Sequence, residues 1–496
     1  MMRVPGQSLT LVIDIGKSHA KLLMADAQGI AVEQHVRDNA SVMSPLAYPA
    51  LDLQGLAEWI VCTLASSANT RLCTHAIATT HGAAMVALGD EGVAWAPLDY
   101  AFDPFSGSLE GTQLPSGQDL AHAYALERDA FEDTLAPDLP AGLNAARQLY
   151  WMQHRHRQVW SRTRSLLPYP QYWAWWFSGV RTSECSSLGC HTQLWRPHQA
   201  CFSMQAHAQG WAKLFAPMRP AWETLGPVRT DLVTSCGLPR SCQIHVGVHD
   251  SNACLARYLK PDLKPDALAR MTTGALTLVT SGTWTVLMAP GAPLGALDPM
   301  SDMLANVDVL GRATPTARFM GGRDFAALLD GAPPDAGSIA DVQYLIGEGI
   351  RASAVPATSP ADLASHGPLV KCQGQQVHDP LRQFLTPGQR SALAALYCAQ
   401  TTAALVQRLW QGSTSVDTSN VIVEGPLVNN GLYLTLLQSL LPDHDCLAST
   451  GSLEGTASGA AALCSWTTGA GPSPMLKPAV ARHVAGLDGY HFHERA

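Results

Sequence analysis

Residue 250 is an aspartate placed where an apolar run gives way to a stretch with helical character. The segment around it reads GVHDSNA over residues 247–253 and follows an expected strand at 244–248. In α/β folds, ligands bind at the carboxyl ends of strands. A carboxylate there can take the proton of a substrate hydroxyl while that oxygen attacks phosphorus, and His249 can hydrogen-bond a neighbouring hydroxyl. A structural role is equally open, with Asp250 capping the helix and His249 filling the interior.

A second acidic residue, Asp14, ends the first aliphatic run of the chain and is followed by a glycine turn. The turn consists of Gly16, Lys17 and Ser18. Backbone N–H groups at such a turn can approach phosphate oxygens, and a neighbouring hydroxyl or amine adds donors. Bound Mg²⁺ would make an acidic residue beside a triphosphate favourable, because Mg²⁺ takes oxygen ligands. Gly282 and Thr283 form a second turn of this kind, and both patterns also occur in turns that bind nothing.

The apolar pattern predicts alternating strands and helices, and therefore an α/β architecture. The first strand, Leu9–Ile15, is expected to form a hairpin with Ala20–Ala25. Further expected strands are 76–80, 83–88, 244–248, 276–280, 284–288 and 421–423, and expected helices are 143–150, 172–177, 391–410, 429–441 and 455–464. The string Leu-Thr-Leu-Val precedes a glycine turn both at 9–12 and at 276–279. The repeated unit predicts two related halves that present loops to a shared cleft.

Composition excludes several classes of protein. Of the 496 residues, 47 % are apolar and 15 % are charged, which excludes intrinsic disorder. The net charge of −8 gives no general attraction for nucleic acid. The uncharged stretch between Arg270 and Asp298 is interrupted by Gly and Pro, so it predicts two strands rather than a membrane helix.

The 12 cysteines have no metal-binding or disulfide spacing, and the first apolar run is too short for a signal peptide, so we expect a cytoplasmic protein.

Six segments follow one another in the order found in a known family. They are DIG (14–16), TTHG (79–82), GVRTSECSSLGCHTQLW (179–195), GVHDSNA (247–253), TSGTWTVLM (280–288) and VIVEGPLVNN (421–430). In these segments the chain resembles the FGGY carbohydrate kinases, within the actin/hexokinase-like ATPase group. The resemblance implies an α/β fold of two ribonuclease-H-like (actin-like ATPase) domains flanking a central cleft. Residues 1–252 would form the sugar-binding domain and residues 253–496 the nucleotide-binding domain.

The resemblance also implies roles for individual residues. Asp250 matches the family's catalytic base, and Asp14 matches the acid that helps to hold Mg²⁺. The implied nucleotide contacts are Gly16, Lys17 and Ser18 in a first phosphate loop, Gly282 and Thr283 in a second, and Gly425 and Asn429 on the adenosine side. The implied sugar contacts are His81, Gly82, His249 and Asn306.

Three positions depart from the family's pattern. Relatives commonly have a hydroxyl-bearing or small residue in place of Lys17, whose amine would contact a phosphate or point to solvent. Pro426, after Gly425, lacks a backbone donor and fixes φ, so nucleotide contacts at this turn need not follow the family. His81 replaces residue types found in several relatives with well-defined sugars, and this leaves the identity of the sugar open.

Together these residues imply an enzyme that uses ATP and Mg²⁺ to phosphorylate a hydroxyl of a ketose. The most similar branch is that of the 6-deoxyketose kinases, L-fuculokinase and L-rhamnulokinase, with L-fuculose as the leading substrate. The alternatives are a kinase of L-rhamnulose, ribulose, xylulose or glycerol, a non-catalytic sugar- or nucleotide-binding regulator of the same fold, and an actin-like ATPase. We expect a small-molecule sugar as the partner, no nucleic acid, no membrane, and an assembly that allows a homodimer.

Overall fold

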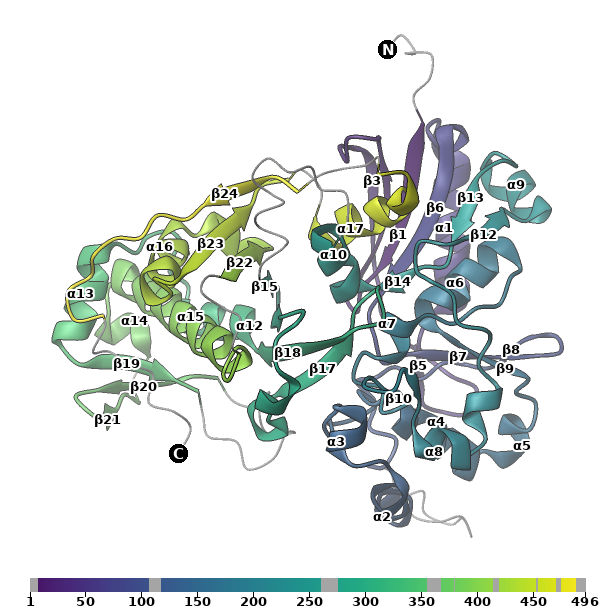
Figure 1. The fold of residues 1–496 in the computed structure, drawn as a ribbon, viewed down its shortest axis with the longest axis horizontal. Coiled ribbons are helices and arrows are strands. Elements are labelled where there is room, and N and C mark those ends of the chain that lie inside the picture. The colour runs from purple at the N-terminus through teal and green to yellow at the C-terminus, as the bar shows by residue number, and fades with distance from the viewer. Residues whose placement is uncertain are drawn as a thin grey trace. The chain divides into compact units, whose positions relative to one another are not determined.

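The computed structural model describes residues 8–106, 117–259, 275–354, 367–378, 380–413, 419–451, 454–469 and 474–487. Strands and helices alternate along this part of the chain, as the sequence predicts (Figure 1). The chain forms two compact units. The first unit comprises Met1–Leu263, Ala305–Ala313 and Ser452–Ser473, and the second comprises Lys264–Leu304, Thr314–Gly451 and Pro474–Ala496.

A seven-stranded sheet lies at the centre of the first unit. Its strands in spatial order are β12 (Thr224–Pro227), β13 (Gln243–His245), β6 (Cys73–Thr80), β1 (Leu9–Ile15), β2 (His19–Ala25) and β3 (Ala31–Asp38), and β14 (Val248–His249) also pairs with β6. β1 and β2 form the predicted antiparallel hairpin, and β1 runs parallel to β6. β1 is mostly aliphatic and buried along almost its whole length, as expected of a central strand.

Helices cover both faces of this sheet. They are α1 (Leu53–Ser66), α6 (Tyr169–Ser178), α9 (Thr230–Cys236), α10 (Asp250–Leu259) and α17 (Gly455–Leu463). Residues of α1, α6 and α9 share a core with Leu11 and Ile13 of β1, whereas residues of α10 and α17 share a core with Val12. Because side chains alternate between the two faces of a strand, Asp14 belongs to the same face as Val12, which is the face covered by α10.

α10 and α17 lie side by side, although they are far apart in the sequence (Figure 1). A Cβ atom on Gly459 of α17 would overlap the carbonyl oxygen of Ala253 in α10, so the glycine permits the close approach. The sequence-based boundary between residues 252 and 253 falls inside α10, and the structure places the whole of this helix in the first unit. The sequence does not reveal that the late helix α17 returns to pack on the first sheet.

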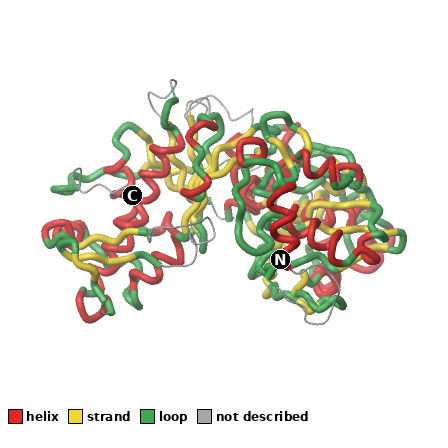
Figure 2. The backbone as a smooth tube through the Cα atoms, turned by 90° about the horizontal axis from the view of Figure 1, so that it is seen from below, coloured by secondary structure: helices red, strands yellow, loops and turns green. Residues whose placement is uncertain are grey.

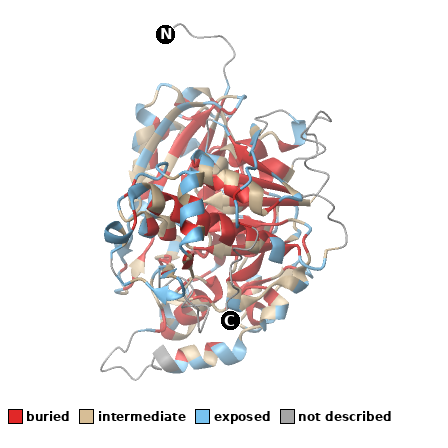
Figure 3. Ribbon diagram, turned by 90° about the vertical axis from the view of Figure 1, so that its left-hand side faces the viewer, coloured by how far each residue is buried: buried red, intermediate tan, exposed pale blue. Residues whose placement is uncertain are grey.

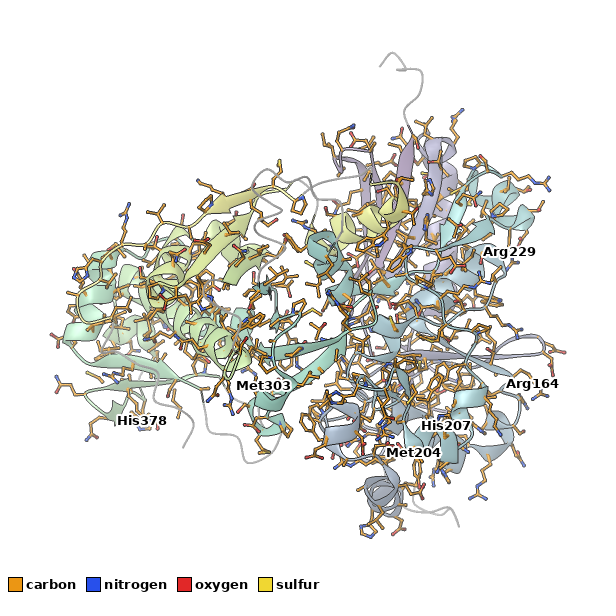
Figure 4. All side chains as sticks on the ribbon, viewed as in Figure 1. Arg164, Met204, His207, Arg229, Met303 and His378 are labelled. Atoms are coloured by element: carbon orange, nitrogen blue, oxygen red, sulfur yellow. The ribbon has the colours of Figure 1, made fainter. Side chains whose placement is uncertain are left out.

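Several of the remaining elements of the first unit share a core rich in aromatic side chains. The strands are β4 (Val42–Met43), β5 (Pro49–Ala50), β7 (Met85–Gly89), β8 (Gly92–Trp95), β9 (Ser165–Pro168), β10 (Trp195–Arg196) and β11 (Cys201–Phe202). The helices are α2 (Gly117–Glu127), α3 (Phe131–Thr134), α4 (Ala145–Arg155), α5 (Arg157–Trp160), α7 (Cys185–Leu188), α8 (Met204–Ala208), η1 (Thr70–Leu72), η2 (Trp211–Lys213) and η7 (Trp466–Thr468). Tyr48 packs edge-on against Trp151 with ring centroids 5.5 Å apart. Charged side chains such as Arg229 lie at the surface (Figure 4).

The second sheet of seven strands belongs mainly to the second unit. Its strands in spatial order are β17 (Met303–Val307), β18 (Ala313–Phe319), β16 (Thr285–Met288), β15 (Ala275–Ser281), β22 (Ser419–Glu424), β23 (His444–Ser449) and β24 (Leu476–Pro478). The associated helices are α12 (Gly321–Leu329), α13 (Ile339–Gly347), α14 (Leu381–Phe384), α15 (Pro387–Leu409), α16 (Gly431–Leu440), η3 (Leu294–Ala296), η4 (Pro299–Ser301) and η6 (Pro426–Asn429). A small sheet contains β19 (Ile350–Ser353), β20 (Leu369–Cys372) and β21 (Gln375–Gln376). Figure 2 distinguishes these helices and strands by colour.

The two large sheets repeat the same local arrangement. In the second sheet, β15 and β16 form an antiparallel hairpin around the turn at 282–284, and β15 runs parallel to β22. In the first sheet, β1 and β2 form the hairpin and β6 is the parallel neighbour. The repeated strand–glycine turn–strand unit predicted from the sequence is therefore present in both halves.

Two expected elements differ in detail. The strand expected at 244–248 is split into β13 and β14, because Gly247 adopts a φ of +88° between them. The helix expected at 429–441 begins only at Gly431, where the Asn430 side chain accepts a hydrogen bond from the Tyr433 N–H at 2.8 Å. Residues 426–429 form the short turn η6 instead, which places Asn429 ahead of the helix.

Buried residues follow the strands and the inward faces of the helices within each unit (Figure 3). Among the helices that the structure describes, none combines the length and the apolar character needed to cross a bilayer. The stretch from 275 to 288 forms strands, as expected, and residues 271–274 of the uncharged segment lie outside the described part of the chain.

Candidate active site

Asp14 is a buried carboxyl at the end of β1. Its exposed fraction is 9 %, and burial raises its pKa from 3.8 to about 7. The negative charge of Asp250 adds to this rise, whereas the positive charge of Lys21 opposes it. The two sequence-predicted carboxylates therefore interact electrostatically within the first unit, as expected from the strand face that Asp14 occupies.

The turn after Asp14 is held by backbone and side-chain hydrogen bonds. The Gly16 N–H donates to the His19 carbonyl at 2.9 Å, and the Asn39 side chain donates to the Gly16 carbonyl at 2.7 Å. The Asn39 N–H donates to the carbonyl of Ser18 at 2.8 Å, and Ser18 is exposed at the tip of the hairpin. The first turn is thus fixed in shape before any ligand binds.

Lys17 is paired with a buried carboxylate. Its ammonium group donates to Asp99, which also accepts a hydrogen bond from Ser41. Burial opposes ionisation of Asp99, but the hydrogen bonds from Lys17 and Ser41 outweigh it and lower the pKa of this carboxyl. The Lys17 ammonium also lies 5.2 Å from the centre of the Tyr100 ring. The Lys17 side chain is 35 % exposed, so it is partly turned to solvent, and its contact with a phosphate stays a prediction.

Asp250 begins α10 and remains accessible. Its side chain is 31 % exposed, and Oδ1 accepts a hydrogen bond from the Ser251 N–H at 2.6 Å. The Nε2 atom of His249 lies 3.2 Å from the same oxygen. The carboxylate therefore has local hydrogen bonds at the helix start and an exposed portion that can meet a ligand.

A tight recess lies next to His249, with no space for a water molecule in this structure, and we call it the imidazole hollow. It is lined by His81, Gly82, Ala83, Ala84, Pro168, Tyr169, Pro170, Ser187 and His249. The Nδ1 atom of His81 is 2.9 Å from the Gly82 carbonyl, and its Nε2 atom is buried without a hydrogen-bond partner among the described residues. Burial lowers the pKa of both His81 and His249, so both imidazoles are neutral at neutral pH.

Gly82 lines the imidazole hollow and lies close to two other side chains. A Cβ atom there would lie 2.8 Å from the Cys190 sulfur and 3.0 Å from the His249 Nε2. A larger residue would therefore displace both neighbours. Asn306, the fourth residue expected at the sugar, is buried in β17 and is not among the residues that line this hollow.

Glu184 is a buried residue near the imidazole hollow that the sequence does not single out. Glu184 is fully buried and accepts hydrogen bonds from the Ser186 and Ser187 N–H groups at 2.9 and 3.0 Å. Burial raises the pKa of Glu184, and the serine hydrogen bonds oppose that rise. The Ser186 hydroxyl also lies 3.4 Å from the His249 N–H. The only signal in the sequence was an acid followed by two serines inside the 179–195 segment.

A cavity of about 570 Å³ lies in the second unit, and we call it the glycine-turn cavity. It is lined by Ser281, Gly282, Thr283, Gly322, Arg323, Phe325, Pro334, Asp335, Pro426, Leu427, Asn429 and Asn430. Three residues expected to bind nucleotide, Gly282, Thr283 and Asn429, are thus brought together from distant parts of the sequence. The volume is in the range typical of small-molecule sites.

Gly425, the fourth such residue in this unit, does not line the cavity but lies against Ser281, which does. It has a φ of +81°, and a Cβ atom would overlap the Ser281 carbonyl oxygen. The Ser281 hydroxyl donates to the Glu424 carbonyl at 2.6 Å and accepts from the Leu427 N–H at 3.0 Å. Pro426 occupies the first position of η6, where a missing N–H costs no hydrogen bond. The glycine turn expected at this position is therefore compatible with the proline found here.

Mg²⁺ suits the donors of the first unit. Asp14 and Asp250 offer carboxylate oxygens, and Mg²⁺ is usually held by one or two carboxylates together with waters and substrate phosphates. No group of three or more His, Cys, Asp or Glu side chains in the described residues forms a ready-made metal cage. The donor set fits an ion that arrives with phosphate oxygens.

Comparison with known proteins agrees with this geometry. Residues 273–472 match the family model described as "Carbohydrate kinase FGGY, C-terminal domain". A carbohydrate kinase from Novosphingobium aromaticivorans is similar over 98 % of this chain and 97 % of its own, at 29 % identity and a TM-score of 0.80. No curated protein matches the sequence.

More distant structures share the fold. A ligand-bound xylulose kinase from Lactobacillus acidophilus is 11 % identical over 97 % of this chain and 95 % of its own, with a TM-score of 0.72. A glycerol kinase from Plasmodium falciparum with ADP is 9 % identical over 96 % and 95 %, with a TM-score of 0.68. The predicted fold class is confirmed. The predicted enzyme class, a phosphotransferase with an alcohol group as acceptor, is confirmed at the level of the carbohydrate kinases.

Proposed function

We propose that this chain, whose residues 273–472 match an FGGY carbohydrate-kinase domain, transfers the γ-phosphoryl group of MgATP to a hydroxyl of a ketose. The proposal depends on one observation: the chain has both a cavity that suits a nucleotide and a carboxylate that suits proton transfer. The second unit has a nucleotide-sized cavity at a glycine turn, and the first has an accessible carboxylate beside neutral imidazoles. A kinase of sugars needs both.

The glycine-turn cavity is proposed to bind ATP. Gly282 and Thr283 offer backbone and hydroxyl donors for phosphate oxygens, because the turn is held tightly and its residues face the cavity. Pro426 and Leu427 provide apolar surface for the adenosine half, with Asn429 as a polar contact. In the first unit, the turn containing Gly16 is proposed to contact the terminal phosphates.

The residues around the imidazole hollow are proposed to contact the sugar, which requires the hollow to open because it has no space for a water molecule in this structure. The unpartnered Nε2 of His81 can exchange a hydrogen bond with a sugar hydroxyl, and this would satisfy a buried polar atom. The His249 ring has its Nδ1 atom 3.2 Å from the Asn252 side-chain amide and its Nε2 atom 3.2 Å from Asp250, so it would meet the sugar beside the Asp250 carboxylate. Neutral imidazoles suit hydroxyl groups, since they act as donors or acceptors without placing charge against an uncharged sugar.

Asp250 is proposed as the catalytic base. The phosphoryl transition state is largely dissociative, so the protein mainly positions the reactants and stabilises charge. Asp250 would accept a hydrogen bond from the attacking hydroxyl, orient its oxygen, and take the proton as the new bond forms. Asp14 would hold Mg²⁺, which neutralises charge on the phosphates when it is bound. The raised pKa of Asp14 means that metal binding competes with a proton near neutral pH.

The sugar is proposed to be a 6-deoxyketose such as L-fuculose. L-rhamnulose, ribulose, xylulose and glycerol are the alternative acceptors within the same chemistry. A non-catalytic regulator of the same fold is the alternative outside it, and the retention of both Asp14 and Asp250 favours the enzyme. A cytoplasmic location is proposed because all 12 cysteines are free thiols. The homodimer remains a prediction.

A coupled assay of ADP release tests the proposal. The protein is incubated with MgATP and each of a panel of ketoses and polyols, with a sugar-free reaction as the reference. We expect one neutral ketose to raise the rate of ADP release far above the reference. Binding of nucleotide or sugar with no acceptor-dependent ADP release would instead identify a regulator.

A further inference from the structure

Arg323 lines the glycine-turn cavity, and neither the sequence nor the proposed function assigns it a role. It is the third residue of α12, directly after Gly322. A Cβ atom on Gly322 would overlap the carbonyl oxygen of Gly282, so the start of α12 lies directly against the glycine turn. The arginine is therefore carried on a helix of nine residues to the place where phosphate is expected.

The Arg323 guanidinium is oriented by a buried anchor. Its Nε and Nη2 atoms donate to Oδ1 of Asp324 at 3.0 and 2.8 Å. The other oxygen of Asp324 accepts a hydrogen bond from the Tyr397 hydroxyl of α15 at 3.0 Å. Asp324 is 5 % exposed, whereas the Arg323 side chain is 29 % exposed. A fixed carboxylate thus holds a partly accessible cation.

Two charged residues, Arg323 and Asp335, line the cavity. Arg323 lies with Gly282 and Thr283, whereas Asp335 lies in the loop whose Pro334 carbonyl accepts a hydrogen bond from Asn430 at 2.8 Å. Phosphate favours the cation and avoids the carboxylate, while hydroxyl and amino groups of a nucleoside tolerate the carboxylate.

We propose that Arg323 is a phosphate-binding residue of the nucleotide site, held in place by Asp324 as a positioning residue. A planar guanidinium can keep one carboxylate and contact a second anion, because it presents five N–H donors in a rigid fork. The inference rests on the proposed function, since it assigns the ligand of that same cavity as a nucleoside diphosphate or triphosphate. Arg323 would supply a positive charge for the phosphate groups, which the backbone and hydroxyl donors of the glycine turn do not carry.

The test compares ADP with adenosine, which lacks phosphate. Affinities for both are measured by titration calorimetry on the full-length wild type, Arg323→Met and Arg323→Lys. We expect Arg323→Met to weaken ADP about 10- to 100-fold, the loss of a charge-assisted hydrogen bond, and to leave adenosine within about twofold. Arg323→Lys should retain part of the ADP affinity, because it keeps the charge but not the fork.

Two further variants complete the test. Asp324→Asn removes the anchoring charge, so a smaller loss of ADP affinity with unchanged adenosine affinity is expected. Arg408→Met is the matched control, because Arg408 lies in the same unit in an exposed ion pair with Asp298 at 2.8 Å; it should change neither affinity.

The outcomes that overturn the inference are distinct from failure of the proposed function. ADP binding that does not depend on Arg323, or equal losses of ADP and adenosine in both Arg323 variants, overturns the inference alone. A wild type that binds no ADP overturns the proposed function and the inference together.

Discussion

The two acidic residues singled out from the sequence occupy contrasting environments. Asp14 is buried with its pKa raised to about 7, whereas Asp250 is nearly one-third exposed and hydrogen-bonded to the start of α10. An accessible carboxylate suits proton transfer to and from a substrate. A buried carboxylate suits the binding of a cation, because the positive charge stabilises the ionised form. Their different burial therefore supports different roles.

Replacing Asp250 by asparagine is predicted to remove most turnover. The amide keeps the size of the side chain but is not a base, so kcat should fall about 10²- to 10⁴-fold while ADP affinity and melting temperature change little. Steady-state kinetics with the best ketose measure the effect. Asp231→Asn is the control, because Asp231 is an exposed partner of Arg229 in the same unit. Turnover of Asp250→Asn within a few-fold of the wild type would exclude the proposed base.

The buried Asp14 is predicted to make stability depend on pH. Its pKa is higher in the folded protein, about 7, than the ordinary 3.8, so the folded state binds more protons between these values. The associated stability is complete below about pH 4 and is lost as the pH rises through 7, by about 4 kcal/mol at most. Without metal, the melting temperature of the wild type should fall from about pH 5 to pH 8 more than that of Asp14→Asn. Parallel curves for the two proteins would show that Asp14 is not the titrating group.

At the scale of elements, each proposed site is built where a hairpin turn meets a second segment. In the second unit, hydrogen bonds of the Ser281 hydroxyl join the turn at 282–284 to the connection between β22 and η6. The same turn is in close contact with the start of α12. In the first unit, β14 delivers His249 and α10 begins with Asp250, after the bend at Gly247. Short, tightly bonded connections hold the functional groups with little freedom, which favours preorganised binding.

Substituting Gly425 by alanine is predicted to disrupt nucleotide binding. The new Cβ atom would overlap the Ser281 carbonyl and displace the turn, so ADP affinity should fall at least about tenfold. Gly412→Ala is the matched control: its φ of +80° equals that of Gly425 within a degree, but no atom lies near its Cβ position. Gly412→Ala should lose about 1 kcal/mol through the strain of a positive φ, and Gly425→Ala should lose more, because its ψ of −165° lies in a region that only glycine adopts readily. If Gly412→Ala weakens ADP as much as Gly425→Ala does, the effect is strain and not the shape of the cavity.

At the scale of the whole molecule, the sequence predicted the pattern of elements, and the roles of the site residues that it indicates stay predictions. The aliphatic run before Asp14, the glycine turns and the repeated strand unit all follow from local rules of burial and turn formation. The residues that it missed depend on long-range contacts. Asp99 meets Lys17, Glu184 supports the imidazole hollow, and Arg323 reaches the glycine turn only because separate segments fold together. The return of α17 to the first sheet is of the same kind.

Phosphorus NMR of the reaction products tests the central claim most directly. The wild type is incubated with MgATP and the ketose that best stimulates ADP release, and the phosphorus resonances are followed with time. We predict a sugar phosphomonoester that accumulates in step with ADP in the wild type and is almost absent with Asp250→Asn. ADP formed together with inorganic phosphate, without a sugar ester, would contradict the account.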